Sequence, residues 1–327
     1  MVKIAITGSS GFIGTNLVTR YKQQGAQVLG LDIVPPRNSQ NGDVHRRVDL
    51  LDRKALGDTL EAFDPDYLFH LGARTDLRGR SVGDYAANVE GVANLMSIVD
   101  RCEALRRVVV ASSRLVCEIG YQPKNETDYR PTTPYGESKV ETEKLVRAAQ
   151  TRKPWTIVRP TSIWGPWFAT PYDLFFRLVG KGLFVRPRGR VIHKSFGFVG
   201  NTVHELDRIA HTQQPIDGKT FYLCDYPPLE VGEWTEMIRE AMGAPKVRSV
   251  PFRVLKLAAT AGDLMERLPL PLPAAPLTTF RLNNLVAEMT YDSSTVAAVA
   301  GELPFSLFEG VEQTAAWLRN HERIKPA

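Results

Sequence analysis

The stretch Lys3-Ile4-Ala5-Ile6-Thr7-Gly8-Ser9-Ser10-Gly11-Phe12-Ile13-Gly14 joins a short apolar run to a glycine-rich turn. A strand that ends in such a turn and leads into a helix is the setting of a dinucleotide-binding loop. In that loop the first glycine permits the tight turn, the second lets the backbone approach a pyrophosphate, and the third lets the helix pack on the sheet. The helix N-terminus then offers N–H groups and a positive dipole end to the phosphates. The cofactor-binding candidates here are Gly8, Ser10, Gly11, Phe12, Ile13 and Gly14.

Downstream of this loop, short runs rich in Val, Ile and Leu alternate with helical patterns. Nearly continuous apolar strands are typical of a parallel sheet covered on both faces. We therefore predict an α/β fold with a doubly wound parallel (Rossmann) sheet. The expected strands are Lys3–Thr7, Gln27–Asp32, His45–Val48, Tyr67–Leu71, Arg107–Ser112 and Thr156–Arg159. The expected helices are Phe12–Gln24, Arg53–Phe63, Tyr85–Cys102 and Pro134–Thr151.

The rhythm changes after Pro160, where prolines and aromatic residues become frequent. We predict an NAD-binding Rossmann domain over residues 1–165 and a smaller C-terminal substrate domain over 166–193 and 213–327. The segment 194–212 is expected to rejoin the first domain, with Phe196–Val203 as a strand and His204–His211 as a helix. Further helices are expected at Val231–Met242 and Leu307–Asn320.

Asp32 ends the second predicted strand, 18 residues after Gly14. An acid at this point hydrogen-bonds the adenosine ribose hydroxyls and repels a 2′-phosphate. The predicted cofactor is therefore NAD rather than NADP, although Arg37 lies close in the sequence.

The segment Tyr135-Gly136-Glu137-Ser138-Lys139 opens a predicted helix, with Thr133 as its N-cap and Pro134 in the first turn. The i, i+4 spacing places Tyr135 and Lys139 on one face. An unperturbed phenol has a pKa near 10, and a neighbouring ammonium favours the phenolate. Tyr135 is thus a candidate base that takes a hydroxyl proton while a hydride leaves the same carbon.

Ser112 and Ser113 end another predicted strand, 22 residues before Tyr135 in the case of Ser113. The carboxyl ends of parallel strands form the edge at which such sheets bind ligands. A serine hydroxyl at this edge can hold the reacting oxygen. The catalytic candidates are Ser113, Tyr135 and Lys139.

Taken in order, these motifs resemble the extended short-chain dehydrogenase/reductase family, in its nucleotide-sugar epimerase/dehydratase branch. The likeness covers about the first 210 residues well and the remainder loosely. It implies that Ser113 completes a Ser–Tyr–Lys triad and that Asp49 and Leu50 contact adenine. It implies further cofactor contacts by Leu71, Gly72, Ala73, Asn88, Ser112, Tyr135, Lys139 and Pro160. His70 is interpreted as a strand-end histidine without a catalytic role.

The chain departs from this family directly after the triad serine. The family's 4,6-dehydratases have an Asp-Glu pair there, whereas this chain has Arg114 and Leu115. Leucine carries no proton, and arginine stays protonated, so neither suits the acid–base work of dehydration. We therefore predict epimerisation or simple oxidoreduction, without loss of water or carbon dioxide.

A basic and aromatic stretch spans residues 167–194. Guanidinium groups suit diphosphates and aromatic faces suit a nucleobase, which favours a nucleotide-diphosphate sugar. The alternative is a solvated basic face over an ordinary core. The aromatic residues of this stretch are Trp167, Phe168, Tyr172, Phe175, Phe176 and Phe184. The substrate-binding candidates are Arg74, Ser162, Arg188 and Arg190.

The predicted activity is an NAD-dependent epimerase that oxidises a nucleotide sugar transiently at C4. The alternative is a net dehydrogenase or reductase of a sugar nucleotide or a hydroxysteroid-like alcohol. A regulator that binds NAD without chemistry is disfavoured, since Tyr135 and Lys139 are both present.

Composition excludes several other classes. The net charge of +5 is expected to be spread along the chain, without the dense basic stripe of a nucleic-acid binder. The three cysteines indicate neither a disulfide framework nor a metal site, and they suggest a reducing cytoplasm. No apolar run is long enough for a membrane span, and no signal peptide is evident. The apolar stretch 252–276 is left as a lid, a dimer-side helix or an interfacial patch.

A homodimer is also expected, through the helical segments Asn88–Cys102 and Pro134–Thr151. The apolar residues that repeat at helical spacing face either the partner or the sheet, and they are Val92, Leu95, Met96 and Val99.

Overall fold

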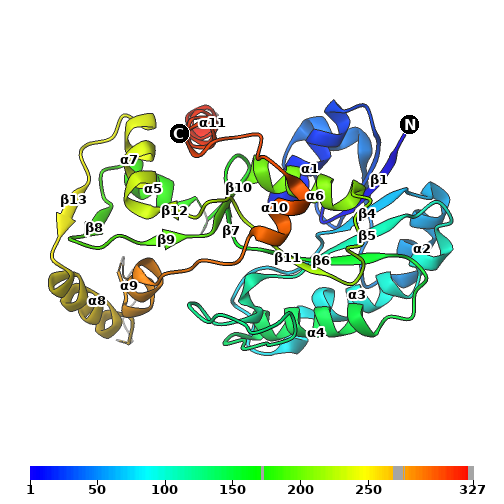
Figure 1. Cartoon of the computed structure of the whole chain (residues 1–327), viewed down its shortest axis with the longest axis horizontal. Helices are drawn as coiled ribbons and strands as arrows, with labels where there is room; N and C mark the ends of the chain where they lie inside the picture. The colour runs from blue at the N-terminus through cyan, green and yellow to red at the C-terminus, as the bar shows by residue number, and fades with distance from the viewer. Residues whose placement is uncertain (171–172, 268–274, 276, 323–327) are drawn as a thin grey trace.

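The computed structural model describes residues 1–170, 173–267, 275 and 277–322. Its main element is a seven-stranded parallel sheet with the strand order β11-β6-β5-β4-β1-β2-β3 (Figure 1). The predicted Rossmann-like α/β fold is thereby confirmed. The strands are β1 Lys3–Thr7, β2 Gln27–Asp32, β3 His45–Arg47, β4 Tyr67–His70, β5 Arg107–Ala111, β6 Trp155–Pro160 and β11 Thr220–Leu223.

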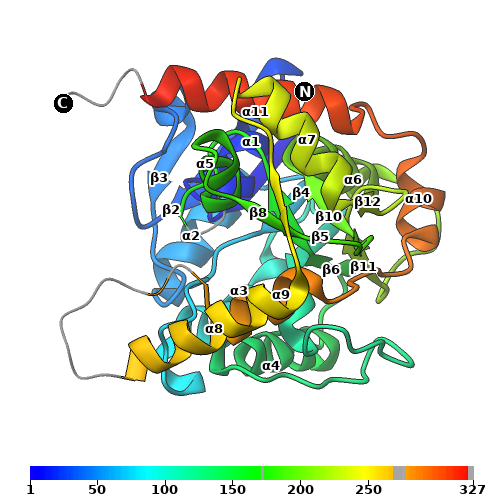
Figure 2. The ribbon, with the colours of Figure 1, turned by 90° about the vertical axis from the view of Figure 1, so that its left-hand side faces the viewer.

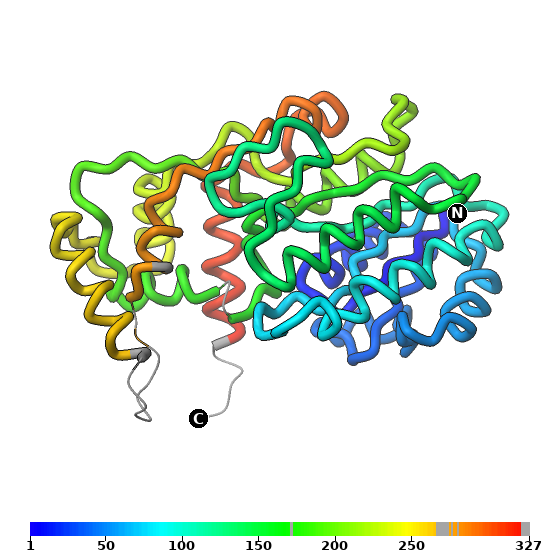
Figure 3. Tube along the Cα trace, turned by 90° about the horizontal axis from the view of Figure 1, so that it is seen from below, coloured from blue at the N-terminus to red at the C-terminus, as the bar shows by residue number. Residues whose placement is uncertain are grey.

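Helices cover both faces of this sheet, which explains why its strands are apolar along their whole length. In β1, Ile4 and Ile6 enter one core while Ala5 enters the other, because successive side chains point to opposite faces. One face is packed by α1 Phe12–Gln23 and α6 Val199–His211. The other is packed by α2 Arg53–Phe63, α3 Ala86–Met96 and α4 Pro134–Ala148, and Figure 3 shows α3 and α4 side by side.

Two element predictions were wrong in their extent. The expected strand Phe196–Val203 ends at Phe198, and α6 begins at Val199. The β-branched residues of that segment imitate a strand, but Val199, Val203 and Leu206 are buried at helical spacing. The expected helix Tyr85–Cys102 is shorter, because α3 covers only Ala86–Met96. The 3-10 turn η2 Val82–Tyr85 precedes it, and the 3-10 turn η3 Val99–Arg101 follows it.

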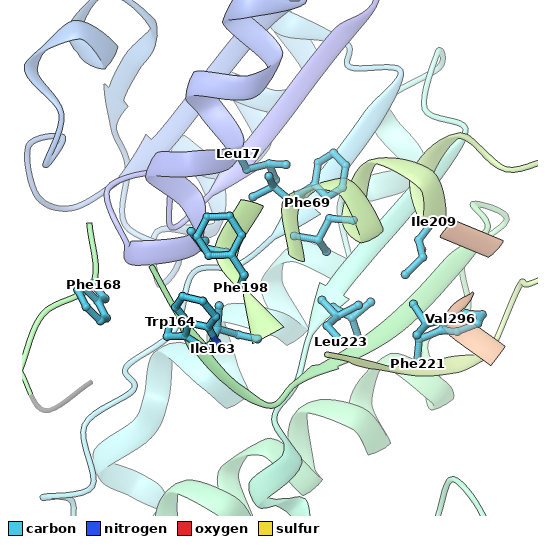
Figure 4. Close-up of a cluster of buried hydrophobic side chains, with 14 of the residues drawn as sticks. Leu17, Phe69, Ile163, Trp164, Phe168, Phe198, Ile209, Phe221, Leu223 and Val296 are labelled. Carbon is cyan, nitrogen blue, oxygen red and sulfur yellow. The ribbon is translucent and has the colours of Figure 1, made fainter. Parts of the chain in front are cut away.

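The predicted domain boundary at residue 213 does not separate the sheet from the second half. β11 lies beyond that boundary and pairs with β6, with Thr220 opposite Ile157. The buried core is likewise continuous: Figure 4 shows Leu17 and Phe69 of the sheet region in one cluster with Trp164 and Phe198. A separate substrate-binding role for the second half stays a prediction.

The second half extends away from the sheet to the left in Figure 1. Its helices are α5 Leu174–Gly180, α7 Val231–Ala241, α8 Phe252–Arg267, α9 Thr279–Val286 and α11 Leu307–Glu322, while α10 Ser294–Ala300 packs on α6. Three two-stranded sheets of the described residues connect them. They pair β7 Ser162–Trp164 with β10 Phe196–Phe198, β9 His193–Lys194 with β12 Leu229–Glu230, and β8 Val185–Pro187 with β13 Arg248–Val250.

Three of the six aromatic side chains expected around a nucleobase belong to the core instead. Phe168 and Phe176 are buried, and Phe175 stacks on Trp234 with a centroid distance of 4.7 Å. The alternative of an ordinary core under this segment is therefore correct for these three rings. Tyr172 lies outside the described residues.

The proposed dimer contacts are also part of the core. Val92, Leu95, Met96 and Val99 are buried in the same cluster as Leu29 of β2, so they face the sheet rather than a partner. These residues do repeat at helical spacing, but a helix that packs on a sheet buries its apolar stripe against that sheet. A homodimer stays a prediction that these side chains do not support.

Candidate active site

The glycine loop between β1 and α1 has the backbone geometry that its sequence predicts. Gly8 has a φ of +68°, which a side chain disfavours. A Cβ on Gly8 would lie 2.6 Å from the Gly72 nitrogen, and one on Gly14 would lie 2.1 Å from the Gly8 carbonyl oxygen. The loop is therefore a cradle that only glycines leave open. The first-turn N–H groups of α1 have no acceptor within the helix, which suits a pyrophosphate.

Asp32 ends β2 directly beside this loop. Its Oδ2 accepts a hydrogen bond from the Ser10 N–H at 3.0 Å, and its Oδ1 accepts one from the Val34 N–H at 3.2 Å. The carboxylate thus supports the loop as well as lying where the ribose of a dinucleotide is expected. Arg37 is held at the same place, since its Nε donates to the Ser10 carbonyl and its Nη1 to the Trp167 carbonyl.

We expect Asp32→Ser to narrow the preference for NAD over NADP by about tenfold, which is about 1.4 kcal/mol. The reason is that serine lacks the negative charge of Asp32, which repels the 2′-phosphate of NADP. Titration of each cofactor by calorimetry measures the two dissociation constants. Asp32→Asn is the matched variant, because its amide oxygen still accepts from Ser10. A wild-type protein that binds NADP better than NAD would contradict this assignment.

Helix α4 carries Tyr135 and Lys139, and its start matches the prediction. The Thr133 side chain accepts from the Gly136 N–H and Pro134 occupies the first turn. Lys139 is 3% exposed and its Nζ donates to the Ala111 carbonyl at the end of β5, at 2.9 Å. Burial lowers the pKa of Lys139 to about 8. The Tyr135 ring is also buried and lies edge-on to Tyr85, with centroids 5.8 Å apart.

Asn88 of α3 braces α4 at this point. Its Nδ2 donates to the Ser138 hydroxyl and to the Arg74 carbonyl, while its Oδ1 accepts from the Arg74 N–H. The Thr142 hydroxyl donates to the Asn88 carbonyl at 2.6 Å. The side chain of Asn88 therefore positions the helix that carries Tyr135 and Lys139, and a direct cofactor contact by Asn88 stays a prediction.

The two serines at the end of β5 have different partners. The Ser113 hydroxyl accepts from the Leu115 N–H at 3.1 Å and caps the 3-10 turn η4 Arg114–Val116. This turn packs on the start of α4 so closely that a Cβ on Gly136 would lie 2.3 Å from the Leu115 carbonyl oxygen. Gly136 thus allows the strand end with Ser113 to approach the helix turn with Tyr135. The Ser112 hydroxyl instead donates to Glu143, at 2.6 Å.

Glu143 belongs to a buried ion pair that sequence reasoning missed. Its carboxylate accepts from Arg159 Nε at 2.8 Å and Nη2 at 2.7 Å, and from the Tyr129 hydroxyl at 3.0 Å. Glu143 is 0% exposed and Arg159 1% exposed. The pair raises the pKa of Arg159 above its ordinary value, against the effect of burial. It ties α4, β6 and the end of β5 together directly behind the candidate triad.

His70 is buried at the end of β4, with its Nδ1 2.8 Å from the Thr7 hydroxyl. Burial, with a smaller contribution from the charge of Lys139, lowers the pKa of His70 to about 3. The imidazole is therefore neutral, which agrees with the structural interpretation made from the sequence.

Two buried cations interact near Arg114, the residue that follows Ser113. Arg114 is 9% exposed, and its Nη1 has no hydrogen-bond partner among the described residues. Burial and the charge of Arg114 lower the pKa of Lys194 to about 8. Burial raises the pKa of Tyr291, and Arg114 counteracts this shift. Sequence reasoning treated Arg114 only as a missing acid, whereas the structure places it beside Lys194 and Tyr291 of the second half.

The other cofactor candidates lie along the carboxyl edge of the sheet. Leu50 packs close to Gly72 and Gly91, while Asp49 is exposed and accepts from the Leu51 N–H. Leu71 and Ala73 flank Gly72 after β4, and Pro160 ends β6. Their contacts to a cofactor stay predictions.

Three of the four substrate candidates have other partners. Arg74 binds Asp76 through Nε and Nη2, and the Asp84 carbonyl through Nη1. Arg188 and Arg190 follow β8 at the end of the molecule away from the seven-stranded sheet (Figure 1). Arg190 lies over the Phe252 ring, 4.0 Å from its centroid. Ser162, in β7, is half-buried next to the sheet.

Within residues 1–170, 173–267, 275 and 277–322, no group of His, Cys, Asp and Glu side chains could hold a metal ion. None of the helices described there is long and apolar enough to cross a bilayer. The cytoplasmic location stays a prediction.

The sequence was compared with protein families and known proteins. The model of the NAD dependent epimerase/dehydratase family matches residues 4–179. The chain is 24% identical to N-acetyl-alpha-D-glucosaminyl-diphospho-ditrans,octacis-undecaprenol 4-epimerase of Escherichia coli O157:H7, covering 95% of this chain and 93% of that protein. It is 28% identical to 3-beta-hydroxysteroid dehydrogenase of Mycolicibacterium neoaurum, covering 75% and 72%.

A solved structure has the same fold over nearly the whole chain. UDP-glucuronic acid 4-epimerase from Bacillus cereus, in complex with UDP-glucuronic acid and NAD, matches with a TM-score of 0.72 and 18% identity. The match covers 98% of this chain and 100% of that one.

Proposed function

Because this chain belongs to the NAD dependent epimerase/dehydratase family and so works with NAD, we propose that it is an epimerase of a nucleotide-diphosphate sugar. The reaction proceeds by transient oxidation at C4. The observations that carry this proposal are the close packing of η4, which follows Ser113, on the first turn of α4, and the Lys139–Ala111 hydrogen bond at the end of β5.

In this reaction Tyr135 removes the proton of the C4 hydroxyl and later returns it. The ammonium of Lys139 favours the phenolate form of Tyr135 electrostatically. The Ser113 hydroxyl holds the reacting oxygen. Asn88 positions α4 through its hydrogen bond to the Ser138 hydroxyl. NAD, when bound in the glycine cradle, supplies the hydride acceptor.

The charge beside Ser113 supports an anionic substrate. Burying two cations near each other is costly unless an anion accompanies them. Lys194 donates to the Asn284 and Ala287 carbonyls, whereas Arg114, the residue after Ser113, leaves its Nη1 without a hydrogen-bond partner among the described residues and therefore suits a substrate anion. The diphosphate of a nucleotide sugar provides one.

Two of the compared proteins support the epimerase, and a third supports a second candidate function. The Bacillus cereus epimerase binds a UDP-sugar on the same fold, and the Escherichia coli relative is a 4-epimerase of a diphospho-linked sugar. The second candidate is a net dehydrogenase of a hydroxysteroid-like alcohol. It is favoured by the 28% identity to a hydroxysteroid dehydrogenase, and it uses the same three catalytic side chains.

Product analysis distinguishes these functions. We expect a panel of UDP-sugars to yield a product of unchanged mass with no net absorbance change at the nicotinamide band. The physical reason is that Arg114 and Leu115 replace the acid pair that dehydration needs, so the hydride returns to C4 and the proton returns to the oxygen bound to C4. Mass spectrometry measures the product mass, and absorbance at the nicotinamide band measures any net reduction of NAD.

A mass loss of about 18 or 44 units would indicate departure of water or carbon dioxide and would overturn the role assignment based on acid–base chemistry. Stoichiometric reduction of added NAD by a steroid alcohol, without turnover of any UDP-sugar, would establish the second candidate instead.

A further inference from the structure

Helix α8 forms the outer end of the second half, opposite the seven-stranded sheet. Figure 2, which views the molecule from that end, shows α8 across the front with α9 behind it. One side of α8 is buried: Leu255 and Ala259 pack with Leu282 of α9 and with Val185 and Val250 of the β8–β13 pair. The helix is thus firmly attached to the body of the protein through one face.

The opposite face of α8 is apolar although it is exposed. Val254 is 52% exposed, Leu257 73% and Leu264 63%. Ala258 and Ala261 are exposed between them, so the series follows the i, i+3, i+4, i+7 spacing of one helix stripe. A surface helix of a globular protein ordinarily carries polar residues on its outward face. An exposed stripe of aliphatic side chains marks a surface that another phase or molecule covers.

The positive charge of the protein is concentrated at this same end. Residues 183–192 and 245–267 together contain eight Lys and Arg residues and two acids, a net charge of +6, whereas the whole chain carries +5. The even spread of charge expected from the sequence is therefore wrong. The seven cations whose side chains are described are all exposed: Arg186, Arg188, Arg190, Lys246, Arg248, Arg253 and Lys256.

The two segments form one surface. β8 pairs with β13, placing Arg186 opposite Ser249, and the guanidinium of Arg190 lies over Phe252 at the start of α8. Arg253 and Lys256 lie on α8 itself, next to Val254 and Leu257. Arg253 and Lys256 thus border the aliphatic stripe, and the other exposed cations lie on or next to the adjoining β8–β13 pair.

We propose that α8 and the β8–β13 pair bind the surface of a bilayer that contains anionic lipids. A helix with aliphatic residues on one side and cations beside them lies in the interface, with its apolar side chains at the boundary of headgroups and acyl chains. The cations meet the lipid phosphates, and each contributes about a fivefold gain in binding to an anionic surface.

The aliphatic composition of the exposed stripe favours a bilayer over an acidic protein as the binding partner. Val254, Leu257 and Leu264 are aliphatic and lie along a single exposed helix, and the exposed cations have long flexible stems that reach a fluid surface. Aromatic anchors in a central pocket, which characterise protein interfaces, are not part of this stripe. The surface lies outside the catalytic groups, so the inference holds for either candidate reaction.

Vesicle co-sedimentation of the full chain tests this proposal. The probes are phosphatidylcholine vesicles with and without about one-third phosphatidylglycerol, at low and high salt. We expect binding to the anionic vesicles, at least about fivefold weaker binding to pure phosphatidylcholine, and release at high salt. Leu257→Ser and Lys256→Glu should each weaken binding at least about fivefold while the melting temperature stays unchanged, since both side chains are exposed.

Phe308→Ser is the matched control, because Phe308 is also an exposed apolar residue, 59% exposed against 73% for Leu257, and lies on α11 beside Glu309. Its vesicle binding should equal that of the wild type. Equal pelleting with both vesicle types, no pelleting with either, or equal losses in Phe308→Ser and Leu257→Ser would each overturn the proposal. Binding to an acidic protein without vesicle binding would replace the bilayer by a protein partner.

Discussion

Phenylalanine in place of Tyr135 should lower turnover at least about a hundredfold while NAD binding stays nearly intact, which is the scale of lost general acid–base catalysis. Phenylalanine retains the buried ring and its edge-on contact with Tyr85, so the fold around α4 is preserved. It removes only the hydroxyl that exchanges the proton. The rate with the UDP-sugar that the panel identifies, and the NAD dissociation constant, measure the two effects.

Tyr121→Phe is the control for this substitution. The Tyr121 hydroxyl donates to Asp128 at 2.9 Å rather than to a triad side chain, and its loss should leave turnover at the wild-type rate. Equal activity of Tyr135→Phe and the wild type would remove Tyr135 from the mechanism. Loss of NAD binding in Tyr135→Phe would instead indicate a disturbed site.

Glu143→Gln should reduce the free energy of unfolding by about 3 to 5 kcal/mol, because it leaves the charge of Arg159 buried without a counterion. The amide has nearly the same shape, yet its NH₂ group competes with the donors of Arg159 and Ser112. For a chain of this length the expected fall in melting temperature is about 4 to 8 °C. Thermal and denaturant unfolding, followed by circular dichroism, measure the change.

Glu141→Gln provides the comparison on the same helix. Glu141 pairs with Lys144 at 2.8 Å, but both side chains are largely exposed, and such pairs contribute about 0 to 1 kcal/mol. Its melting temperature should therefore remain close to that of the wild type. If Glu143→Gln and Glu141→Gln were equally stable, the buried pair would not hold the end of β5 in place.

Local sequence patterns were sufficient for the sheet strands β1 to β6 and for the catalytic helix. The glycine loop, the strand end at Asp32 and the N-cap Thr133 each involve residues within a few positions of one another, and the structure has them as predicted for Gly8, Gly14 and the start of α4. Such motifs are determined by backbone sterics and by hydrogen bonds over one turn. These short-range constraints are visible in a single sequence.

Tertiary structure decided which apolar stripes are covered and which charges meet. Val92 and Leu257 both belong to stripes at helical spacing, yet Val92 is 1% exposed and Leu257 73% exposed. Only the placement of α3 against the sheet and of α8 at the outer end separates them. Likewise Glu143 and Arg159 are 16 residues apart, and Ser112 is 31 residues from Glu143. No local sequence pattern therefore predicts the hydrogen bonds among these three side chains.

The same limit explains β11 and the basic end of the second half. Thr220–Leu223 joins the sheet because its backbone pairs with β6, and the cations of residues 183–192 and 245–267 share a surface because β8 pairs with β13. Periodicity reports which side of an element is apolar, but it does not report what lies against that side. That depends on contacts between residues distant in the chain, whose free energy arises only when the whole fold brings them together.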